Sequence, residues 1–565
     1  MTVTAPALPM VTVEPAMPRG SDEYERKRAA IQQRLADSIP VALRLSQEAI
    51  SAAPKNVTSV PRSCGLLTPR ELSITEDHDA VGLAAALAAR TYTAVEVAIA
   101  FCKRAVLAHQ LTCCLTEFFM DEALARAAEL DAHLAATGTT VGPLHGVPVS
   151  VKAHMPLAGH HVDVGSISSQ RAVEADSQAI AIVRAAGAVF FCKTNQPQLV
   201  MHLESASHHG RTLNPHNMGL TAGGSSGGEA ALLAMKGAAL GIGSDIGGSI
   251  RVPAAFCGIY GFKPTSNVLP RRDGLPGGAT AAELTVPATW GPMARSLRDM
   301  DLLMGVFSAA RPWRVDPRLS VTPWTGVATA WPPGGRPLRV GFMLHDGAIR
   351  PQPPVVRALE WAESRLRAAG TEVEVKPFAP LRTAEAVRNT RLAYFPYGVD
   401  AMRRAMAESG EPLLPLSEWV VRDAEASPTP TTEGLLAMSR AKEAFWYDWA
   451  AHWAAHDVDV LVCPAFCGPA AAHGTAKHWN YSVLFNYLDM PAAVLPTPVV
   501  AGARGAERYA EGEPLSGECE EVRGFWEGGD FEGAPVNIQV VAPRQHDSEL
   551  FAALKLLGKH LDVKQ

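Results

Sequence analysis

The sequence predicts an α/β protein in which a single large domain is built on a central mixed β-sheet covered by helices on both faces. From about residue 144 to 265, patterns typical of strands, turns and helices alternate, as they do where helices pack against a sheet. The alternation returns after residue 336, where LRVGFM predicts a strand and PPVVRALEWAESRLRAAG a helix that ends at Gly370. No charged run or long Ser/Gly tract divides the middle of the chain, so its 565 residues are expected to share one core.

The boundaries of this domain follow from changes in pattern. Residues 1–74 are expected to form an N-terminal arm, because charged and apolar residues interleave there at near-helical spacing from Ser21 to Ser51 and predict an amphipathic helix. The main domain is then expected to extend over residues 75–560, with its core motifs in residues 144–265.

Three segments of the chain carry more specific expectations. Residues 91–136 are predicted to be helical, with Thr93 as the N-cap. Residues 310–336 are rich in Pro, Gly and Trp and are expected to form a surface connection. Residues 502–530 are rich in Gly and Glu and show no apolar periodicity, so we expect a mobile insertion there.

Composition limits the class of partner. Hydrophobic residues make up 47% of the chain and charged residues 19%, below the roughly 25% of average globular proteins, which suits a large buried core. The formal net charge is −6, so neither nucleic acid nor an anionic membrane is favoured as the main partner. A small neutral or amphipathic molecule is expected instead, and a homodimer is kept open as the assembly.

Cysteine usage and hydropathy indicate the compartment. The nine cysteines are an odd number, and several lie in apolar runs, as Cys192 and Cys257 do, which is typical of free buried thiols in a reducing compartment. No stretch of about 18 uncharged apolar residues occurs. The sequence therefore predicts a soluble cytoplasmic protein with no transmembrane segment, although a monotopic membrane contact would leave no such mark.

Two glycine-rich turns between Thr221 and Pro264 carry the most informative pattern in the chain. Ser225 lies in GGSSGG and Ser249 in DIGGS, and an apolar helical segment separates them. Glycine is needed where the backbone takes positive φ or approaches a ligand closely, so both turns are expected to face a ligand. An isolated Gly-Ser turn is usually structural, but two such turns preceded by a suitable base favour catalysis.

The second turn has the composition of a nucleophile beside its own oxyanion hole. Ser249 Oγ would attack a carbonyl carbon while neighbouring backbone N–H groups hold the oxygen that gains charge. The expected donors are the N–H groups of Ile246, Gly247, Gly248 and Ser249.

A serine hydroxyl needs a base, and Lys152 is the best candidate. None of the 18 histidines stands in a local pattern that marks a triad partner. In PLHGVPVSVK, a turn precedes a short apolar β-like run, and Lys152 stands at the exit of that run. An ammonium group among apolar residues loses solvation, which lowers its pKa and makes a neutral general-base amine available.

Together, GVPVSVK, GGSSGGE and GSDIGGSIRVPAAFCGIYGFKPT resemble the amidase signature family of hydrolases, which use a Lys, cis-Ser, Ser triad. The resemblance implies that Lys152 is the base, that Ser225 is the bridging serine after a cis peptide bond, and that Ser249 is the nucleophile. Ser226 is then a neighbour of the relay and not part of it. The spacing of the two serines agrees with that of the family.

The resemblance covers about residues 75–560, and FNYLDMPA and the NPHN turn are most similar to fungal acetamidase-like and fatty acid amide hydrolase-like members. Two departures from the family pattern concern the surroundings of the base. Ala153 stands where many members carry an acidic residue, and HHVDVGS at residues 160–166 replaces a threonine-rich turn. Pocket walls are expected from residues 266–290, 385–440 and 470–490.

Other residues receive supporting roles. The resemblance places Met201 on the acyl side of the pocket, with core packing as an equal alternative, and Gly224 beside the substrate. Arg251 is expected to orient the nucleophile's turn through a buried ion pair, and Asp245 to accept hydrogen bonds from the same turn.

No metal or cofactor is expected. His145, His154, His160 and His161 lack a carboxylate at ligand spacing, and Cys463 and Cys467 lack a second pair of ligands. These residues are interpreted as polar pocket, surface or core residues.

The sequence thus predicts an amidohydrolase that cleaves a small to medium primary or simple secondary amide to an acid plus ammonia or an amine. One alternative is an amidotransferase subunit, which would need partner subunits. Another is a non-catalytic protein that binds phosphate in its glycine loops, but GIGSDI lacks the third glycine of G-x-G-x-x-G and GFKPT does not match a Walker lysine.

Overall fold

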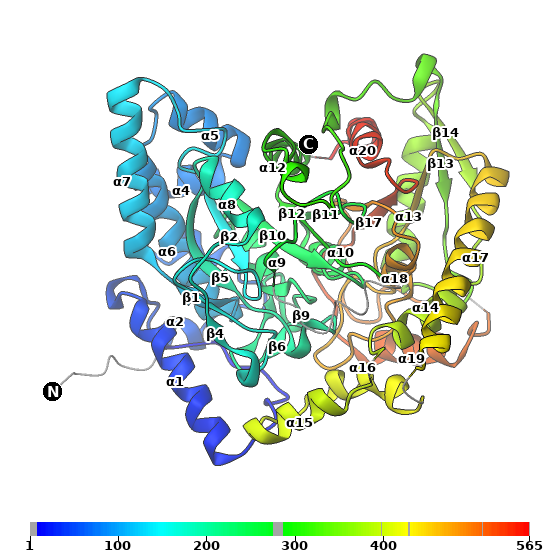
Figure 1. Cartoon of the computed structure of the whole chain (residues 1–565), viewed down its shortest axis with the longest axis horizontal. Coiled ribbons are helices and arrows are strands. Elements are labelled where there is room, and N and C mark those ends of the chain that lie inside the picture. Colours follow the sequence, from blue (N-terminus) through cyan, green and yellow to red (C-terminus); the bar gives the residue numbers. More distant parts are fainter. Residues whose placement is uncertain (1–7, 275–285, 397, 428–429, 511, 564–565) are drawn as a thin grey trace.

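Within the residues that the computed structural model describes, which are 8–274, 286–396, 398–427, 430–510 and 512–563, eleven strands form one mixed sheet flanked by helices (Figure 1). In sheet order the strands are β1 (Leu115–Phe118), β5 (Val189–Thr194), β2 (Pro148–Lys152), β10 (Leu240–Asp245), β12 (Thr289–Ala294), β11 (Tyr260–Lys263), β16 (Ala492–Leu495), β17 (Ile538–Val541), β15 (Val460–Pro464), β13 (Leu338–Phe342) and β14 (Val373–Pro377). The predicted α/β class and central mixed sheet are confirmed.

The sheet has parallel pairs toward both ends and antiparallel pairs in between. β5, β2 and β10 are mutually parallel, as are β15, β13 and β14, whereas the pairs from β10 through β15 are antiparallel. Nearly every residue of the central strands is buried, as expected for a sheet whose two faces are both covered.

The helices of the first half are α1 (Asp22–Ser38), α2 (Gln47–Ser51), α3 (Val60–Ser63), α4 (Pro69–Glu76), α5 (Ala80–Ala88), α6 (Ala94–Thr112), α7 (Met120–Thr137), α8 (Gln178–Ala185), α9 (Gly227–Ala234) and α10 (Arg251–Cys257). Those of the second half are α12 (Leu297–Ala309), α13 (Pro353–Arg367), α14 (Thr383–Ala393), α15 (Asp400–Ser409), α16 (Pro415–Glu425), α17 (Thr432–His456), α18 (Asn480–Tyr487), α19 (Gly517–Gly528) and α20 (Asp547–Leu561). Small two-stranded pairs join β3 (His161–Val162) to β4 (Arg171–Ala172), β6 (Ala206–Ser207) to β7 (Gly210–Arg211), and β8 (Leu213–Asn214) to β9 (Asn217–Thr221).

The prediction of one helical region over residues 91–136 is wrong in its middle. Thr93 caps α6 as expected, with Glu96 completing a capping box, but Cys113 takes a left-handed conformation (φ 53°) that ends the helix. The chain then enters β1, which pairs with β5 at the edge of the sheet, before α7 begins.

The expectation of a segment without apolar periodicity at residues 502–530 is also wrong in its second half. Ser516 caps α19, which buries Cys519, Val522 and Trp526. Residue 511 lies outside the described residues. The predicted amphipathic helix of the N-terminal arm is divided in the structure into α1 and α2, because the chain leaves the helix at Pro40.

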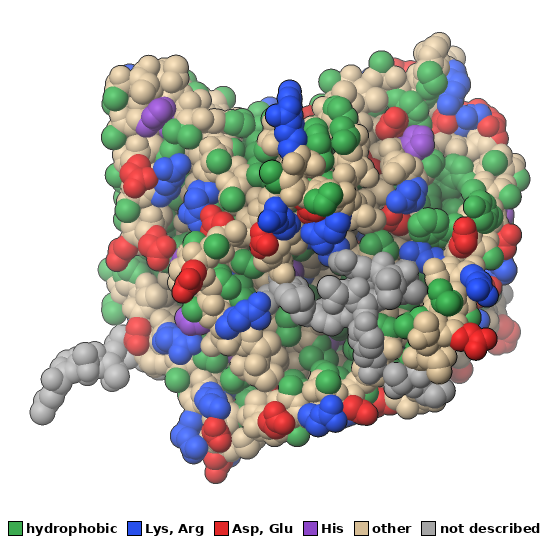
Figure 2. Space-filling view, in the orientation of Figure 1, with side chains coloured by type: hydrophobic (Ala, Val, Ile, Leu, Met, Phe, Trp, Pro, Cys, Tyr) green, Lys and Arg blue, Asp and Glu red, His purple; other side chains and the backbone are tan. Residues whose placement is uncertain are grey.

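The surface and the cysteines agree with the composition. Basic and acidic side chains are interspersed on the face shown in Figure 2, in keeping with the small net charge. All nine cysteines are free, and seven of them are buried. Among the described helices, none is both long enough and apolar enough to cross a membrane.

The topology brings Lys152 and the two glycine-rich turns toward the same end of neighbouring strands. β2 and β10 are parallel neighbours, so their carboxyl ends lie at the same edge. β2 ends at Lys152 and β10 at Asp245. The two glycine-rich turns lie just before α9 and α10, which pack against each other.

Candidate active site

Lys152 is fully buried at the end of β2, and its amine faces two hydroxyls. Nζ donates to Ser225 Oγ at 2.6 Å and to Ser244 Oγ at 3.0 Å. Burial lowers the pKa of Lys152 well below its ordinary value of 10.5, although the negative charges of Asp245 and Glu229 oppose the shift. The neutral amine that a general base requires is therefore favoured in the folded protein.

Ser225 follows a cis peptide bond from Gly224, as the family resemblance implies. The turn is fixed to the second serine turn through the backbone, because the N–H of Ser226 donates to the carbonyl of Ser249 at 3.0 Å. Ser225 and Ser249 are both buried, with exposed fractions of 1% and 5%. The fold thus brings Lys152, Ser225 and Ser249 from three separate segments into one buried constellation.

The turn before Ser249 presents backbone donors. In the described part of the chain, the N–H groups of Ile246, Gly247 and Ser249 donate to no other protein group. The N–H of Gly248 donates to Asp245 Oδ1 at 2.8 Å, which differs from the expectation that it faces the substrate. Three amides of the turn are therefore free to donate to a ligand, and the fourth shapes the turn.

Glycine is required at two positions of this turn. Gly248 has φ 122°, and a Cβ there would lie 2.5 Å from Ser482 Cβ. A Cβ on Gly247 would lie 2.7 Å from the hydroxyl of Tyr394, which donates to the carbonyl of Ile246 at 2.7 Å. The turn is held from outside by Tyr394, the C-cap residue of α14, and by Ser482 of α18, and no local motif indicates either contact.

Asp245 and Arg251 form a fully buried ion pair beneath the turn. Arg251 Nε donates to Asp245 Oδ2 and Nη2 to Oδ1, both at 3.0 Å. Burial alone would raise the pKa of Asp245, but the Arg251 guanidinium outweighs it and holds that pKa below its ordinary range. Asn486 Oδ1 and Gln539 Oε1 each accept a further Arg251 N–H group at 2.6 Å, so four of the five guanidinium N–H groups donate to buried side chains.

Removing this cation is expected to destabilise the whole domain. Arg251→Met leaves the Asp245 carboxylate buried without its counter-charge, and we expect the free energy of unfolding to fall by about 3–5 kcal/mol. Urea unfolding followed by intrinsic fluorescence measures the change. Arg367→Met is the matched control, because Arg367 pairs with Glu363 on the surface of α13 and its loss should change stability by less than about 1 kcal/mol. Equal changes in the two variants would contradict the structural role of Arg251.

Glu229 and Ser244 are site residues that sequence reasoning missed. Glu229, in the first turn of α9, is fully buried and accepts from Ser150 Oγ at 2.5 Å and from Thr194 Oγ1 at 2.8 Å. Burial raises its pKa to about 7, against the effect of these two hydrogen bonds. It ties α9 to β2 and β5 and supplies the acidic neighbour of Lys152 that Ala153 does not. An acidic residue inside the apolar EAALLA run was the available signal.

The two remaining substrate-side predictions lie near the first serine turn. A Cβ on Gly224 would lie 2.6 Å from the carbonyl oxygen of His202, so residues 202–204 lie directly against this turn. Met201 immediately precedes them, is half-buried and packs against the core. Of the expected pocket walls, residues 275–285 lie outside the described residues.

A buried lysine hydrogen-bonded to a serine hydroxyl, near a second serine whose turn has free backbone amides, is an arrangement that suits a hydrolase. A family model described as Amidase matches residues 96–551, and the chain belongs to this family. It is an amidase, a hydrolase that acts on carbon–nitrogen amide bonds.

Individual relatives agree along almost the whole chain. The chain is 42% identical over 503 residues to a provisionally named amidase of Schizosaccharomyces pombe, covering 88% of this chain and 92% of that one. It is 34% identical over 554 residues to an acetamidase of Aspergillus oryzae, covering 96% and 99%. A solved structure of a fatty acid amide hydrolase matches with a TM-score of 0.89 and 32% identity over 96% of both chains.

Proposed function

We propose that the protein hydrolyses amides through an acyl-enzyme on Ser249, with Lys152 as the base and Ser225 as the relay between them. The observation that carries the proposal is the 2.6 Å hydrogen bond from a fully buried Lys152 Nζ to Ser225 Oγ. A lysine without solvent around it is neutral more readily than a surface lysine, and a neutral amine can accept a proton.

Acylation proceeds by proton transfer along this line. Lys152 takes the Ser225 proton as Ser225 takes that of Ser249, whose oxygen bonds to the amide carbon and produces a tetrahedral oxyanion. The proton returns along the same path to the leaving nitrogen, the carbon–nitrogen bond breaks, and ammonia or an amine departs. Water then attacks the ester of the acyl-enzyme. Ser225 and Lys152 transfer the proton of this water to Ser249 Oγ, which regenerates the free serine and releases the acid.

The oxyanion is bound by the N–H groups of Ile246, Gly247 and Ser249. Their positions are fixed before substrate binds, because Asp245 accepts from the N–H of Gly248 and Tyr394 donates to the carbonyl of Ile246. Donors that need no reorganisation stabilise developing charge better than water does.

The substrate is proposed to be a small to medium primary or simple secondary amide with an apolar acyl group. Relatives named for acetamide and for fatty acid amides define the range of acyl length. In this chain, the Trp479 ring lies 3.4 Å from the position of a Cβ on Gly247, and Tyr394 and Trp419 lie beside it. These aromatic rings place an apolar wall beside the oxyanion donors.

An amide panel tests the proposal. We expect ammonia or amine release from at least one of acetamide, benzamide, an aryl acetamide and a long-chain acyl amide, and the rates across the panel rank the acyl groups. Benzamide, a medium amide with an apolar acyl group, should be preferred over acetamide by about tenfold or more in kcat/KM if the aromatic wall binds the acyl group, since burying an apolar ring contributes about 1.5–3 kcal/mol. A folded protein that releases nitrogen from none of the four would contradict the hydrolase mechanism and favour an amidotransferase subunit.

A further inference from the structure

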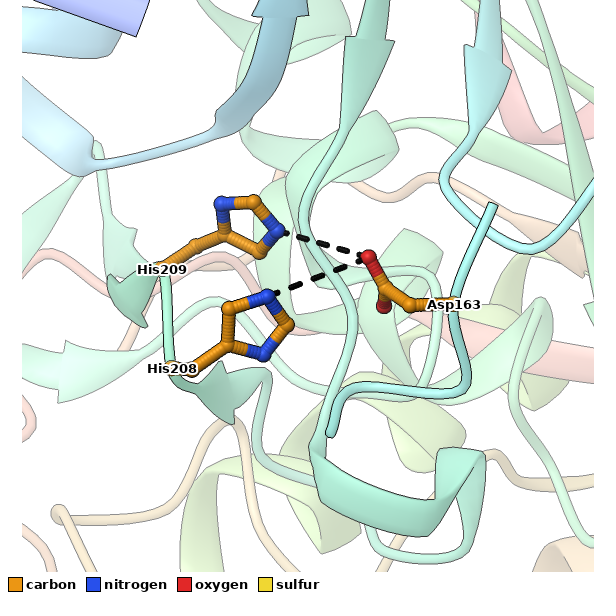
Figure 3. Close-up of side chains that lie close together, drawn as sticks. All are labelled: Asp163, His208 and His209. Atoms are coloured by element: carbon orange, nitrogen blue, oxygen red, sulfur yellow. Dashed lines mark hydrogen bonds and ion pairs between the residues drawn. The ribbon is translucent and has the colours of Figure 1, made fainter. Parts of the chain in front are cut away.

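Three potential metal ligands converge between two loops outside the proposed catalytic groups. Among the described residues, donor atoms of Asp163, His208 and His209 all lie within 4.8 Å of one another, and all three residues are buried. Figure 3 shows both imidazoles directed at the same carboxylate. The histidines form the turn between β6 and β7, and Asp163 directly follows β3, so two separate loops supply the set.

The distances suit a tetrahedral cation. Asp163 Oδ2 lies 3.9 Å from His208 Nε2 and 3.5 Å from His209 Nε2. Zinc with bonds of about 2.0–2.2 Å in tetrahedral geometry separates its ligand atoms by roughly 3.4 Å. These gaps are too long for strong hydrogen bonds, and they need only small shifts to become zinc geometry.

The unsatisfied polarity of His208 also points to a ligand. Its side chain is fully buried, yet neither ring nitrogen makes a hydrogen bond to another described residue. A buried polar atom without a partner destabilises a fold by about 1–3 kcal/mol, and a metal ion at this position would partner one of the two nitrogens.

The carboxylate has the second layer of contacts expected of a metal ligand. Asp163 Oδ1 accepts from the N–H of Gly165 at 2.7 Å, and the Asp163 carbonyl accepts from Gln196 Nε2 at 2.8 Å. Oδ2 is thereby left facing the imidazoles. Such outer contacts orient ligands and raise metal affinity.

We propose that Asp163, His208 and His209 bind a divalent cation of the zinc class as three protein ligands. Two imidazoles and one carboxylate are a ligand set typical of zinc with one open position. Asp163 and His209 also line a cavity of about 270 Å³, which has room for a coordinated water or small ligand.

The proposed cation would fasten the β6–β7 turn to the loop after β3. The segment leading into β6 holds the catalytic turn, because Ser205 Oγ accepts from the N–H of Gly227 at 3.0 Å and the N–H of Ser205 donates to the carbonyl of Gly223 at 3.0 Å. The role is therefore structural support of the Ser225 turn, and the cation takes no part in the proposed acyl transfer.

Metal analysis of the untagged full-length protein tests the proposal. The cells are grown in medium that contains zinc, and the protein is purified by gel filtration. We then expect about one zinc per chain by elemental mass spectrometry. Asp163→Asn keeps the size of the side chain and removes its charge, and we expect it to bind zinc about 100-fold more weakly in competition with a chromophoric chelator. His208→Phe is expected to weaken binding at least as much.

The control is His145→Gln, because His145 is another buried histidine with an unpartnered ring nitrogen but belongs to no such cluster. Its zinc affinity should equal that of the wild type. If a variant fails to fold, the proposal is still tested by adding cobalt to the wild-type protein. Tetrahedrally coordinated cobalt absorbs strongly in the visible range, so we expect this absorption to appear. Wild-type protein that binds neither zinc nor cobalt stoichiometrically, or Asp163→Asn protein that binds zinc normally, would overturn the proposal.

Discussion

Ser249→Ala is expected to lower kcat for amide hydrolysis by about 10⁵- to 10⁶-fold while the protein stays folded. The reason is chemical, because without Oγ no acyl-enzyme forms and the lysine–serine relay has no proton to move. The side chain is small, and the turn is held by hydrogen bonds of Asp245, Tyr394 and Ser482 that the change leaves in place, so the free energy of unfolding should change by less than about 1 kcal/mol. Steady-state ammonia release and covalent labelling by an organophosphonate both measure the effect.

Ser226→Ala is the matched control for this loss. Ser226 is a buried serine in the neighbouring turn, and its Oγ accepts from the N–H of Ser244 at 3.3 Å without contacting Lys152. We expect its kcat to fall by less than about tenfold and its labelling to persist. Labelling that survives in Ser249→Ala and disappears in Ser226→Ala would exchange the two roles and refute the proposed nucleophile.

The sequence could indicate that Lys152, Ser225 and Ser249 come together, because their signals are local. Lys152 ends a short apolar run, and Ser225 and Ser249 each lie in a glycine-rich turn followed by a helix, so motif order alone ties them to one edge of a sheet. Parallel pairing of β2 with β10 then brings the ends of distant segments together. The α/β class followed from the same alternation of elements.

Other features could not be predicted because they depend on tertiary pairing. Tyr394 supports the carbonyl of Ile246 from a distant helix, and nothing in its local sequence points to that turn. The edge strand β1 has only four residues and lies between two long helices, whose periodicity hides it. Helix α19 has apolar residues only at 519, 522 and 526 on its buried side, a weak pattern among glycines and glutamates.

The histidine cluster is a further feature that could not be predicted from the sequence, because distant segments supply it. His208 and His209 are adjacent, but their carboxylate partner Asp163 lies in a different loop. Ligand spacing along the sequence therefore predicted no metal site, whereas the folded chain places the three side chains together. Motif spacing finds a ligand set only when one local element supplies most of it.

Lys152→Met is expected to lower kcat by about 10⁴-fold or more and to remove the acidic limb of the pH profile. In the wild type, burial lowers the pKa of Lys152 well below 10.5, so kcat/KM should rise with pH as the amine loses its proton. Methionine fills a similar volume without a basic atom. Rates measured between pH 5 and 10 on the best amide of the panel provide the comparison.

The same shift predicts a pH-dependent stability that the variant lacks. At pH values between the lowered pKa of Lys152 in the folded protein and its ordinary value of 10.5, the unfolded chain carries a proton on Lys152 that the folded chain does not. Because the unfolded state binds more protons in this window, the contribution of Lys152 to the free energy of unfolding rises with pH there, and it is smallest below the folded pKa. Urea unfolding of the Met variant should show a smaller rise with pH than the wild type over this window.

Lys193→Met is the control that distinguishes the loss of the proposed base from the loss of a buried lysine in general. Lys193 lies on the neighbouring strand β5, is equally buried, and burial lowers its pKa to about 8, but it contacts neither Ser225 nor Ser249. This variant should keep the acidic limb and lose less than about tenfold in kcat, even though its own stability changes with pH in the same direction as that of Lys152→Met. If the acidic limb disappears in Lys193→Met and persists in Lys152→Met, the base is not Lys152, and the 2.6 Å contact with Ser225 is structural only.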